Sequence, residues 1–302
     1  MNPLPPGVGD ILRGRLRGEV LENEPLENRT TYRIGGLARF LVCPQDLEDL
    51  KVLNQIIRDL RLPRFVLGGG SNVLVSDHGF QGIVIHLHHF NRLEIEEERV
   101  SAGAGLQLDG LVVECLRRSL AGLEKLSGIP GTLGGALRMN AGAFDAEISN
   151  YLCTVECLDF LGSYRVLNKQ EVQFHYRQAP AIRDTYILGA TFQFTRNDVE
   201  ELFRIRETTL ARRYEKQPWQ YPSAGSVFKR PAGYYTGKLI EDLGLKGRRS
   251  GRAQISPKHA GIIINLGGAT ADDVLQLIHL ARNEVHRAYG IDLELEQELV
   301  GF

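Results

Sequence analysis

Apolar side chains recur at helical spacing in three long stretches of the chain. Residues 46–60 carry one such stripe, and Asp46 precedes it at the position of an N-cap. Residues 106–120 and 271–289 carry the others, and Gly290 follows the third where helices commonly end. We therefore predict three amphipathic helices over these ranges. Their apolar faces consist of Leu47, Leu50, Leu53, Ile56, Ile57 and Leu60; of Leu108, Leu111, Val112, Cys115 and Leu116; and of Val274, Leu277, Ile278, Ala281 and Val285.

Shorter apolar runs predict strands between these helices. Residues 64–67 form a run that stops at three consecutive glycines, and residues 82–87 and 261–265 form two more. Residues 153–167 predict a hairpin that turns near Gly162, with further strands to about residue 194. Because helices and strands alternate early while strands dominate the middle, the pattern predicts a mixed α+β protein.

The change from strands to a helix near residue 197 predicts a domain boundary. Asn197 with Glu200 resembles a capping box, and a further helix is predicted over 236–243, ended by Gly244. The apolar face of the helix after the boundary would consist of Val199, Leu202 and Phe203. A chain of 302 residues is too long for one core, so two or three domains are expected.

Composition and charge narrow the range of functions. The chain holds 36 Lys and Arg against 37 Asp and Glu, so no overall field attracts nucleic acid or an anionic membrane. Residues 1–6 lack the basic and apolar segments of a secretory signal, and no run of about 18 apolar residues occurs. Four cysteines do not make a disulfide framework in a chain of this length, and we interpret all four as core residues. We expect a cytoplasmic protein without nucleic-acid or membrane partners.

Two glycine-rich loops carry the strongest chemical signal. The first directly follows the strand predicted at 64–67, and the second begins at residue 128 and continues through Asn140 and Gly142. Glycine lets the backbone approach a ligand closely, and successive N–H groups in such turns form a concave anion site. The first loop reads Gly68, Gly69, Gly70, Ser71, Asn72, Val73 and Leu74, and the second begins Gly128, Ile129, Pro130, Gly131, Thr132, Leu133, Gly134 and Gly135.

Familiar phosphate-binding motifs do not explain these loops. The sequence has no Gly-x-x-x-x-Gly-Lys-Ser/Thr, and Gly103-Ala104-Gly105 lacks the third glycine of a dinucleotide fingerprint. Each loop alone is best explained as a tight turn between packed elements. Two long loops with interleaved Ser, Thr and Asn donors favour ligand binding.

Three polar positions in the later part of the chain suggest chemistry. Ser226 has small neighbours on one side, so a ligand can approach it, although it is not the centre of a Gly-x-Ser-x-Gly elbow. A serine hydroxyl can deliver a proton if an acid such as Glu296 assists, and Arg177 can hold a carboxylate. By sequence alone, Ser226 is better explained as a turn serine, and Glu296 better still as part of a solvated strand face with Glu294 and Glu298. Arg177 suits a surface ion pair as well as a carboxylate site.

A histidine cluster raises the question of a metal site. His86 and His88 alternate on a predicted strand and would share one face, with His89 beside them. Neither a carboxylate nor a cysteine lies at ligand spacing nearby in the sequence, and the pair Cys153 and Cys157 offers too few ligands by itself. We therefore expect no metal and interpret the histidines as structural.

The order of these segments closely resembles that of UDP-N-acetylenolpyruvoylglucosamine reductases. The resemblance runs from about residue 28 onward and covers 28–36, the loop at 68, 128–144, 176–177, 222–229, 237–241 and 293–301. It implies an FAD-binding fold of the p-cresol methylhydroxylase type in two parts, 1–86 and 87–197. It further implies an α+β substrate domain over 198–296, with 297–302 returning to the first part.

The resemblance also implies roles for particular residues. Ser226 would be the proton donor, with Arg177 and Glu296 as its catalytic companions. Lys216, Tyr176 and Lys229 would bind the substrate, and the two glycine loops would bind the flavin. The implied flavin-binding residues are Gly68, Gly69, Gly70, Ser71, Asn72, Val73, Leu74, Gly128, Ile129, Pro130, Gly131, Thr132, Gly134, Gly135, Asn140 and Gly142.

The reaction implied by the resemblance is NADPH-dependent, FAD-mediated reduction of the enolpyruvyl double bond of a UDP-sugar, which yields UDP-N-acetylmuramate. Two rivals stay open: another flavin oxidoreductase of the same fold, such as a sugar or alcohol oxidase, and a non-catalytic UDP-sugar binding protein. The chain departs from the family pattern at Ala179 and Arg230, where serine and asparagine are common. It lacks the extra tyrosine-bearing loop, as in the shorter subclass of the family.

Overall fold

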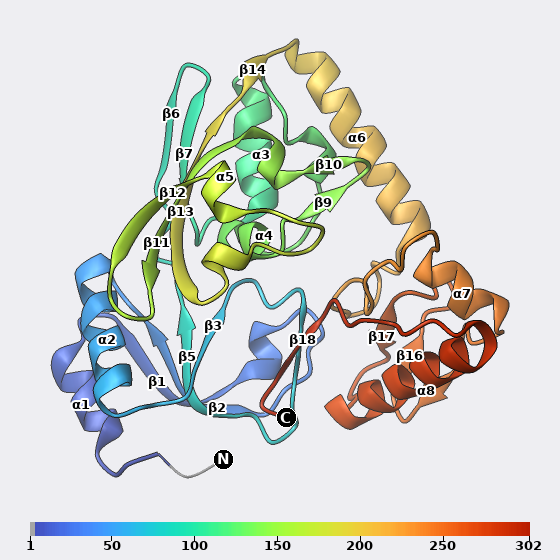
Figure 1. Ribbon diagram of the computed structural model, residues 1–302, viewed down its shortest axis with the longest axis horizontal. Helices are drawn as coiled ribbons and strands as arrows, with labels where there is room; N and C mark the ends of the chain where they lie inside the picture. The colour runs from blue at the N-terminus through green and yellow to red at the C-terminus, as the bar shows by residue number, and fades with distance from the viewer. Residues whose placement is uncertain (1–3) are drawn as a thin grey trace.

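The computed structural model describes residues 4–302 and is organised around three main sheets (Figure 1). Residues 1–3, part of the N-terminal stretch considered for a secretory signal, lie outside the described residues. Within residues 4–302, no helix combines the length and the apolar character needed to cross a membrane. Segments from all three sheets meet at the candidate site.

The first sheet is covered by two helices on one face. Its elements are α1 (Val8–Arg15), β1 (Glu19–Pro25), η1 (Leu26–Arg29), β2 (Leu37–Cys43), α2 (Leu47–Asp59), β3 (Arg64–Leu67) and β5 (Phe80–His86). The strand order is β1-β2-β5-β3, with β1 antiparallel to β2 and the other pairs parallel. Buried side chains of α1 and α2 form one cluster with those of β2 and β5, so burial of these faces holds the layer together.

Helix α2 forms as its sequence predicts. The side chain of Asp46 accepts a hydrogen bond from the backbone N–H of Asp49 at 3.0 Å, which satisfies one of the free donors of the first turn. Leu50, Leu53 and Ile57 of its apolar stripe are fully buried. The predicted helix over 46–60 is confirmed.

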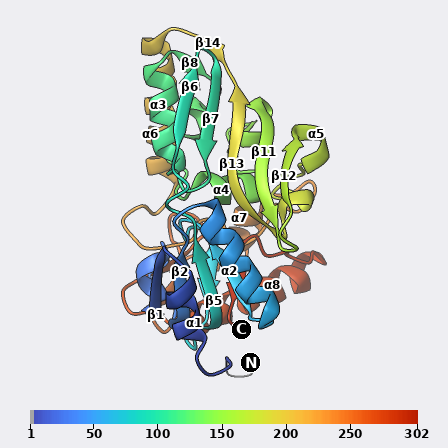
Figure 2. The same ribbon diagram turned by 90° about the vertical axis from the view of Figure 1, so that its left-hand side faces the viewer.

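The second sheet is antiparallel throughout. Its strands are β6 (Leu93–Glu96), β7 (Arg99–Gly103), β11 (Leu152–Asp159), β12 (Tyr164–Asn168) and β13 (Thr185–Gln193), in the order β12-β11-β13-β7-β6. The predicted hairpin at 153–167 is confirmed, and Gly162 adopts a φ of 99° in its turn. Figure 2 shows β5 of the first sheet pointing toward this second sheet. The two sheets also share a core, because Leu158 and Tyr186 pack with residues of the first sheet.

Helices and short strands complete this second region. They are α3 (Leu108–Arg117), β8 (Leu120–Ala121), η2 (Glu124–Leu126), α4 (Leu133–Arg138), β9 (Gly142–Ala143), β10 (Ala146–Glu147), η3 (Ile148–Tyr151), α5 (Lys169–Val172), η4 (Pro180–Ile182) and β14 (Thr195–Arg196). The apolar stripe of α3 is buried against the sheet, as predicted. The predicted further strands to about residue 194 are confirmed in β13, which ends at Gln193, although α5 and η4 come between β12 and β13.

The third region packs helices on a small sheet. Its elements are α7 (Thr236–Asp242), β15 (Arg249–Ser250), β16 (Ala253–Ile255), β17 (Ile263–Asn265) and α8 (Ala271–Tyr289). Helix α6 (Val199–Lys216) leads into it, but its buried Leu202 packs in the core of the second region. In Figure 1, α6 runs from the second region down to the third. The predicted helix over 271–289 is confirmed, with all five residues of its stripe buried and Gly290 in the left-handed conformation at its end.

A short strand late in the chain returns to the first region. β18 (Glu298–Val300) pairs in parallel with β4 (Val73–Val75), the strand that directly follows the first glycine loop. The N–H of Glu298 donates to the carbonyl of Asn72 at 3.0 Å, and the N–H of Ser76 donates to the carbonyl of Val300 at 2.8 Å. This pairing places residue 296 beside the loop at 68–72.

Two sequence predictions need correction. The N-cap of α6 is Asp198, whose side chain accepts from the N–H of Glu201 at 2.9 Å, rather than Asn197. Asn197 instead continues the pairing of β14 with β8, because its N–H donates to the carbonyl of Ser119. The interpretation of all four cysteines as core residues also fails in one case, because Cys153 is only partly buried.

The buried stripe of α8 provides a stability test. Leu277→Ala removes a side chain that is 1% exposed, and we expect a loss of about 2–5 kcal/mol in the free energy of unfolding from lost burial and a residual cavity. The control is His279→Ala on the exposed face of the same helix, which should change stability by less than about 0.5 kcal/mol. Equal effects of the two substitutions in chemical denaturation would contradict this packing.

Candidate active site

The two glycine loops are in direct contact with each other. A Cβ built on Gly69 would lie 2.5 Å from the Cα of Gly131, and one on Gly68 would lie 2.8 Å from Oγ1 of Thr132. Ser71 fastens the contact, because its hydroxyl donates to the carbonyl of Pro130 at 2.9 Å. Only glycine permits so close an approach of two backbones, so the loops form one continuous surface with little side-chain bulk.

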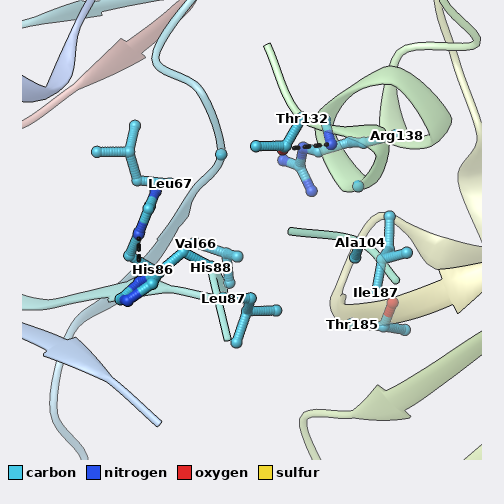
Figure 3. Close-up of a pocket in the computed structure, with 13 residues that line it drawn as sticks. Val66, Leu67, His86, Leu87, His88, Ala104, Thr132, Arg138, Thr185 and Ile187 are labelled. Carbon is cyan, nitrogen blue, oxygen red and sulfur yellow. Dashed lines mark hydrogen bonds between the residues drawn. The ribbon is translucent and has the colours of Figure 1, made fainter. Parts of the chain in front are cut away.

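A cavity opens beside this contact, between the first and second sheets. Figure 3 shows His86, His88 and Leu67 on one side and Thr132 and Arg138 on the other. Its lining comes from β3, β5 and the first loop on one side and from α4 and β13 on the other. The lining residues are Val66, Leu67, Gly68, His86, Leu87, His88, Ala104, Thr132, Gly134, Gly135, Arg138, Thr185 and Ile187.

Arg177 and Glu296, separated by more than a hundred residues, form an ion pair. Nε of Arg177 donates to Oε1 of Glu296 at 2.9 Å, and Nη2 donates to the carbonyl of Gly142 at 2.9 Å. The guanidinium is therefore held between the second glycine loop and the carboxylate. Arg177 has a φ of 56° and Asn140 a φ of 42°, a left-handed conformation that costs energy in residues other than glycine and that recurs at functional sites.

Glu296 is the buried member of its acidic triplet. Its side chain is 13% exposed, against 68% for Glu294 and 40% for Glu298, so the alternative of a uniformly solvated strand face is wrong. Regular pairing begins only at Glu298, and the preceding backbone turns Glu296 inward. Its N–H donates to the carbonyl of Val227, and its carbonyl accepts from Nδ2 of Asn72, each at 2.9 Å.

Burial controls the protonation of this carboxyl. Loss of solvent raises the pKa of Glu296, against the lowering effect of the charges on Arg177 and Lys229. A carboxyl group with a raised pKa keeps its proton to a higher pH than a surface glutamate does. The site therefore holds a guanidinium and a perturbed acid in contact.

Ser226 lies close to the Arg177–Glu296 pair, because the next residue in the chain, Val227, is hydrogen-bonded to Glu296. It forms an antiparallel bridge with Ile262, and its neighbour Val227 accepts the N–H of Glu296. Gln297 fixes the preceding turn, because its Nε2 donates to the carbonyls of Ala224 at 3.0 Å and Gly225 at 3.4 Å. The serine is exposed, so a ligand has access to it.

The three expected substrate-binding residues differ in their contacts. Tyr176 contacts the cluster directly, since its ring lies 5.1 Å from the Arg177 guanidinium and its hydroxyl accepts from the N–H of Arg230. Lys229 pairs with the carboxylate of Glu294. Lys216 is exposed at the end of α6.

Arg213 is a candidate residue that the sequence did not single out. It is 6% exposed, and among residues 4–302 its Nε and Nη2 find no hydrogen-bond partner. The closest charge complement, Asp109, is already occupied by Arg206 and by the N–H of Gly128. In the sequence, Arg213 stands in a strongly charged helix beside Arg212, where both look solvent-facing, so no signal distinguished it.

Burial lowers the pKa of Arg213, and the positive charge of Arg177 lowers it further. The negative charge of Asp109 acts in the opposite direction. Its guanidinium lies over the Phe144 ring at 5.3 Å and its side chain packs near Gly128. A buried cation without a partner is costly unless an anionic or electron-rich ligand supplies acceptors. Together with the bare backbone surface of the two loops, it fits FAD, whose diphosphate and ring carbonyls need many donors and little bulk.

Comparison with protein families supports this fit. Residues 38–168 match the family model of an FAD binding domain. Residues 217–300 match the model of the C-terminal domain of UDP-N-acetylenolpyruvoylglucosamine reductase. These two matches include both glycine loops, Ser226 and Glu296.

Comparison with whole proteins extends the similarity over nearly the full chain. A UDP-N-acetylenolpyruvoylglucosamine reductase of Clostridium botulinum (strain 657 / Type Ba4) is 41% identical over 283 residues, 93% of this chain and 92% of the relative. The reductase of Caldanaerobacter subterraneus subsp. tengcongensis is 42% identical over 300 residues, 97% of this chain and 99% of the relative.

Solved structures agree. The crystal structure of the reductase from Thermus caldophilus matches with a TM-score of 0.80 and 36% identity, covering 94% of this chain and 99% of that one. BBE-like 1 of Physcomitrella patens matches at a TM-score of 0.51 and 14% identity over 92% of this chain and 60% of that one, a likeness of fold alone. The expected α+β class with a two-part FAD-binding fold is confirmed. The extent and level of identity show that this chain belongs to the UDP-N-acetylenolpyruvoylglucosamine reductase family.

Proposed function

We propose that this protein reduces the enolpyruvyl double bond of UDP-N-acetylenolpyruvoylglucosamine to give UDP-N-acetylmuramate, with FAD as cofactor and NADPH as reductant. The observation that carries the proposal is the partly buried Arg177–Glu296 pair, which lies against the second glycine loop and beside the segment of Ser226. When bound and reduced by NADPH, FAD would supply the hydride for the terminal carbon of the double bond. All further steps depend on residues of the chain.

Residues 1–86 and 87–197 together would hold the cofactor, and residues 198–296 would hold the UDP-sugar. Backbone N–H groups of the loops beginning at Gly68 and Gly128 would bind the diphosphate of FAD. Arg213 would provide hydrogen bonds to an electron-rich part of the cofactor, because its guanidinium is buried beside the second loop and has donors to spare.

Arg177 and Glu296 would stabilise charge on the substrate. Addition of hydride to the terminal carbon leaves negative charge on the neighbouring carbon and its carboxylate. A guanidinium fixed by Gly142 and Glu296 needs no reorganisation to meet that charge. Glu296, with its pKa raised by burial, would act in its protonated form.

Ser226 would deliver the proton that completes the reduction. Its hydroxyl hydrogen would pass to the carbon next to the carboxylate, so that one hydride and one proton are added across the double bond. Exposure of Ser226 gives substrate access, and the backbone contact of Val227 with Glu296 keeps the serine segment next to the acid.

The substrate's sugar nucleotide would extend toward the third region. Tyr176 and Lys229 would line its path, and Lys216 at the end of α6 would bind phosphate. Since both NADPH and nucleotide sugars are intracellular metabolites, we propose a cytoplasmic location. The rival functions, a flavin oxidase and a non-catalytic binding protein, are less well supported, because relatives that share 41% identity over 93% of the chain are named as reductases.

The first test is Ser226→Ala. Reduction of bound flavin by NADPH should proceed as before, because the hydroxyl acts only in the second half-reaction. Product formation should fall by about 10²–10⁴-fold, as for loss of a positioned acid. Stopped-flow flavin absorbance separates the two half-reactions. Ser163→Ala, in the exposed hairpin turn, is the control; unchanged turnover in Ser226→Ala would remove this serine from the mechanism.

Glu296→Gln tests the buried acid through stability. Because the folded-state pKa of Glu296 is raised, its ionisation disfavours the folded state, so the wild type should lose stability relative to the variant as pH rises through that pKa. Below the unfolded-state pKa of the carboxyl, the difference should no longer change with pH. Denaturant unfolding of both proteins at a series of pH values measures this. A difference that stays constant across the series would show that the carboxyl has an ordinary pKa.

Arg213→Met separates cofactor binding from folding. The substitution removes a buried unpaired cation, so the FAD-free protein should be as stable as the wild type or more stable. Its affinity for FAD should fall at least about tenfold, since hydrogen bonds from a charged donor are lost. Fluorescence titration with FAD and thermal unfolding measure the two effects. Arg212→Met, at the exposed neighbouring position, should change neither; normal FAD affinity in Arg213→Met would exclude this role.

A further inference from the structure

One end of the first sheet gathers side chains that commonly bind metal ions. In the β1–β2 pair, Glu19 lies opposite Cys43. In the β2–β5 pair, Val42 lies opposite Ile85, so Cys43 comes next to His86 at the strand ends. His88 follows two residues later. The strand register therefore brings Cys43 and the two histidines together, although Cys43 is 43 residues away from His86 in the sequence.

The ligand atoms lie at the spacing that one ion requires. The sulfur of Cys43 and one ring nitrogen from each of His86 and His88 all lie within 4.8 Å of one another. Nδ1 of His86 is 3.1 Å from Nδ1 of His88. Tetrahedral zinc, with bonds of about 2.0–2.3 Å, places its ligand atoms about 3.3–3.8 Å apart, so small shifts suffice to close the site.

Burial affects the imidazole of His86 and the thiol of Cys43 in opposite directions. Burial, reinforced by the neighbouring His88, lowers the pKa of His86 to about 4, which leaves a neutral imidazole with a free lone pair at neutral pH. Burial raises the pKa of the Cys43 thiol to about 12, so the thiol holds its proton until an ion displaces it. Binding would therefore release one proton from sulfur.

We propose that Cys43, His86 and His88 form a binding site for one divalent ion of the zinc class. One thiolate and two imidazoles are ligands that such ions prefer over calcium and magnesium. His86 and His88 also belong to the lining of the cavity between the two sheets, so the proposed site borders that cavity (Figure 3). With one thiolate and a divalent ion, the complex carries a net single positive charge at that wall.

A second set of groups overlaps with this site. Glu19, His88 and His89 also bring one ligand atom each within 4.8 Å of the others. This second set shares His88 with the first, but an exposed carboxylate takes the place of the buried thiol. It therefore offers a weaker and less selective site for a thiophilic ion. Variants of Cys43 and His89 distinguish the two sets.

Cobalt titration of the FAD-loaded enzyme tests the proposal. We expect one Co²⁺ per chain, a thiolate-to-cobalt charge-transfer band, and tetrahedral d–d bands at longer wavelengths than the flavin absorbs. Addition of one equivalent of Zn²⁺ should abolish these bands. Cys43→Ser and His88→Gln should each weaken binding at least about tenfold, and Cys43→Ser should remove the charge-transfer band. His88 is partly exposed, and retained flavin absorbance verifies that each variant is folded.

Two matched variants serve as controls. Cys153→Ser changes the partly buried cysteine of the second sheet, and His89→Gln changes the neighbouring histidine; both should bind cobalt as the wild type does. Absence of stoichiometric cobalt binding, or an octahedral spectrum alone, would overturn the proposal. So would full binding by Cys43→Ser combined with loss of binding in His89→Gln, which would assign the ion to Glu19, His88 and His89.

Discussion

The pairing of β18 with β4 is the contact on which the candidate site depends. Three consecutive residue pairs join these strands in parallel, and Asn72 holds the carbonyl of Glu296 from the first glycine loop. The same stretch contacts Val227 from the third region and Arg177 from the second. One short segment thereby links a cofactor loop, the serine turn and the guanidinium, and without it these groups would belong to separate parts of the fold.

The distribution of charge inside this junction is unequal. Arg213 is a buried cation and Arg177 a partly buried one, whereas Glu296 is the one carboxylate that reaches Arg177 there among the described residues. Asp109 is turned toward Arg206 and Gly128 instead. Desolvating cations without full compensation costs free energy, so a ligand that brings negative charge to Arg213 would stabilise this junction. A diphosphate-bearing cofactor and a substrate with a carboxylate both meet that requirement.

Periodicity was sufficient to predict the elements that are amphipathic. Helices α2, α3 and α8 and the β11–β12 hairpin follow from apolar spacing and glycine positions, because each buries one face against a single layer. The N-cap of α6 is Asp198, one residue later than predicted. Asn197 instead takes part in the preceding strand pairing, where its N–H donates to the carbonyl of Ser119. Resemblance to a family, rather than local pattern, was needed to select the two-part fold.

The site residues also divide into those that a sequence pattern predicts and those that only the fold brings together. Glycine loops are visible in a sequence because their composition is unusual, but the burial of Glu296 and the isolation of Arg213 arise only from tertiary contacts. Cys43 is the clearest case: no local pattern associates it with His86, and only the β2–β5 register brings them together. Long-range register is the information that a linear pattern of residues lacks.

The position of Glu296 along the chain has a consequence for biosynthesis. Both glycine loops, Arg177 and Ser226 precede it, so the ribosome adds this carboxyl after all other groups of the site. The first two sheets can fold around their own cores while residue 296 is still to be made. A nascent chain would therefore complete both glycine loops, which we propose bind FAD, before it acquires the proposed catalytic acid.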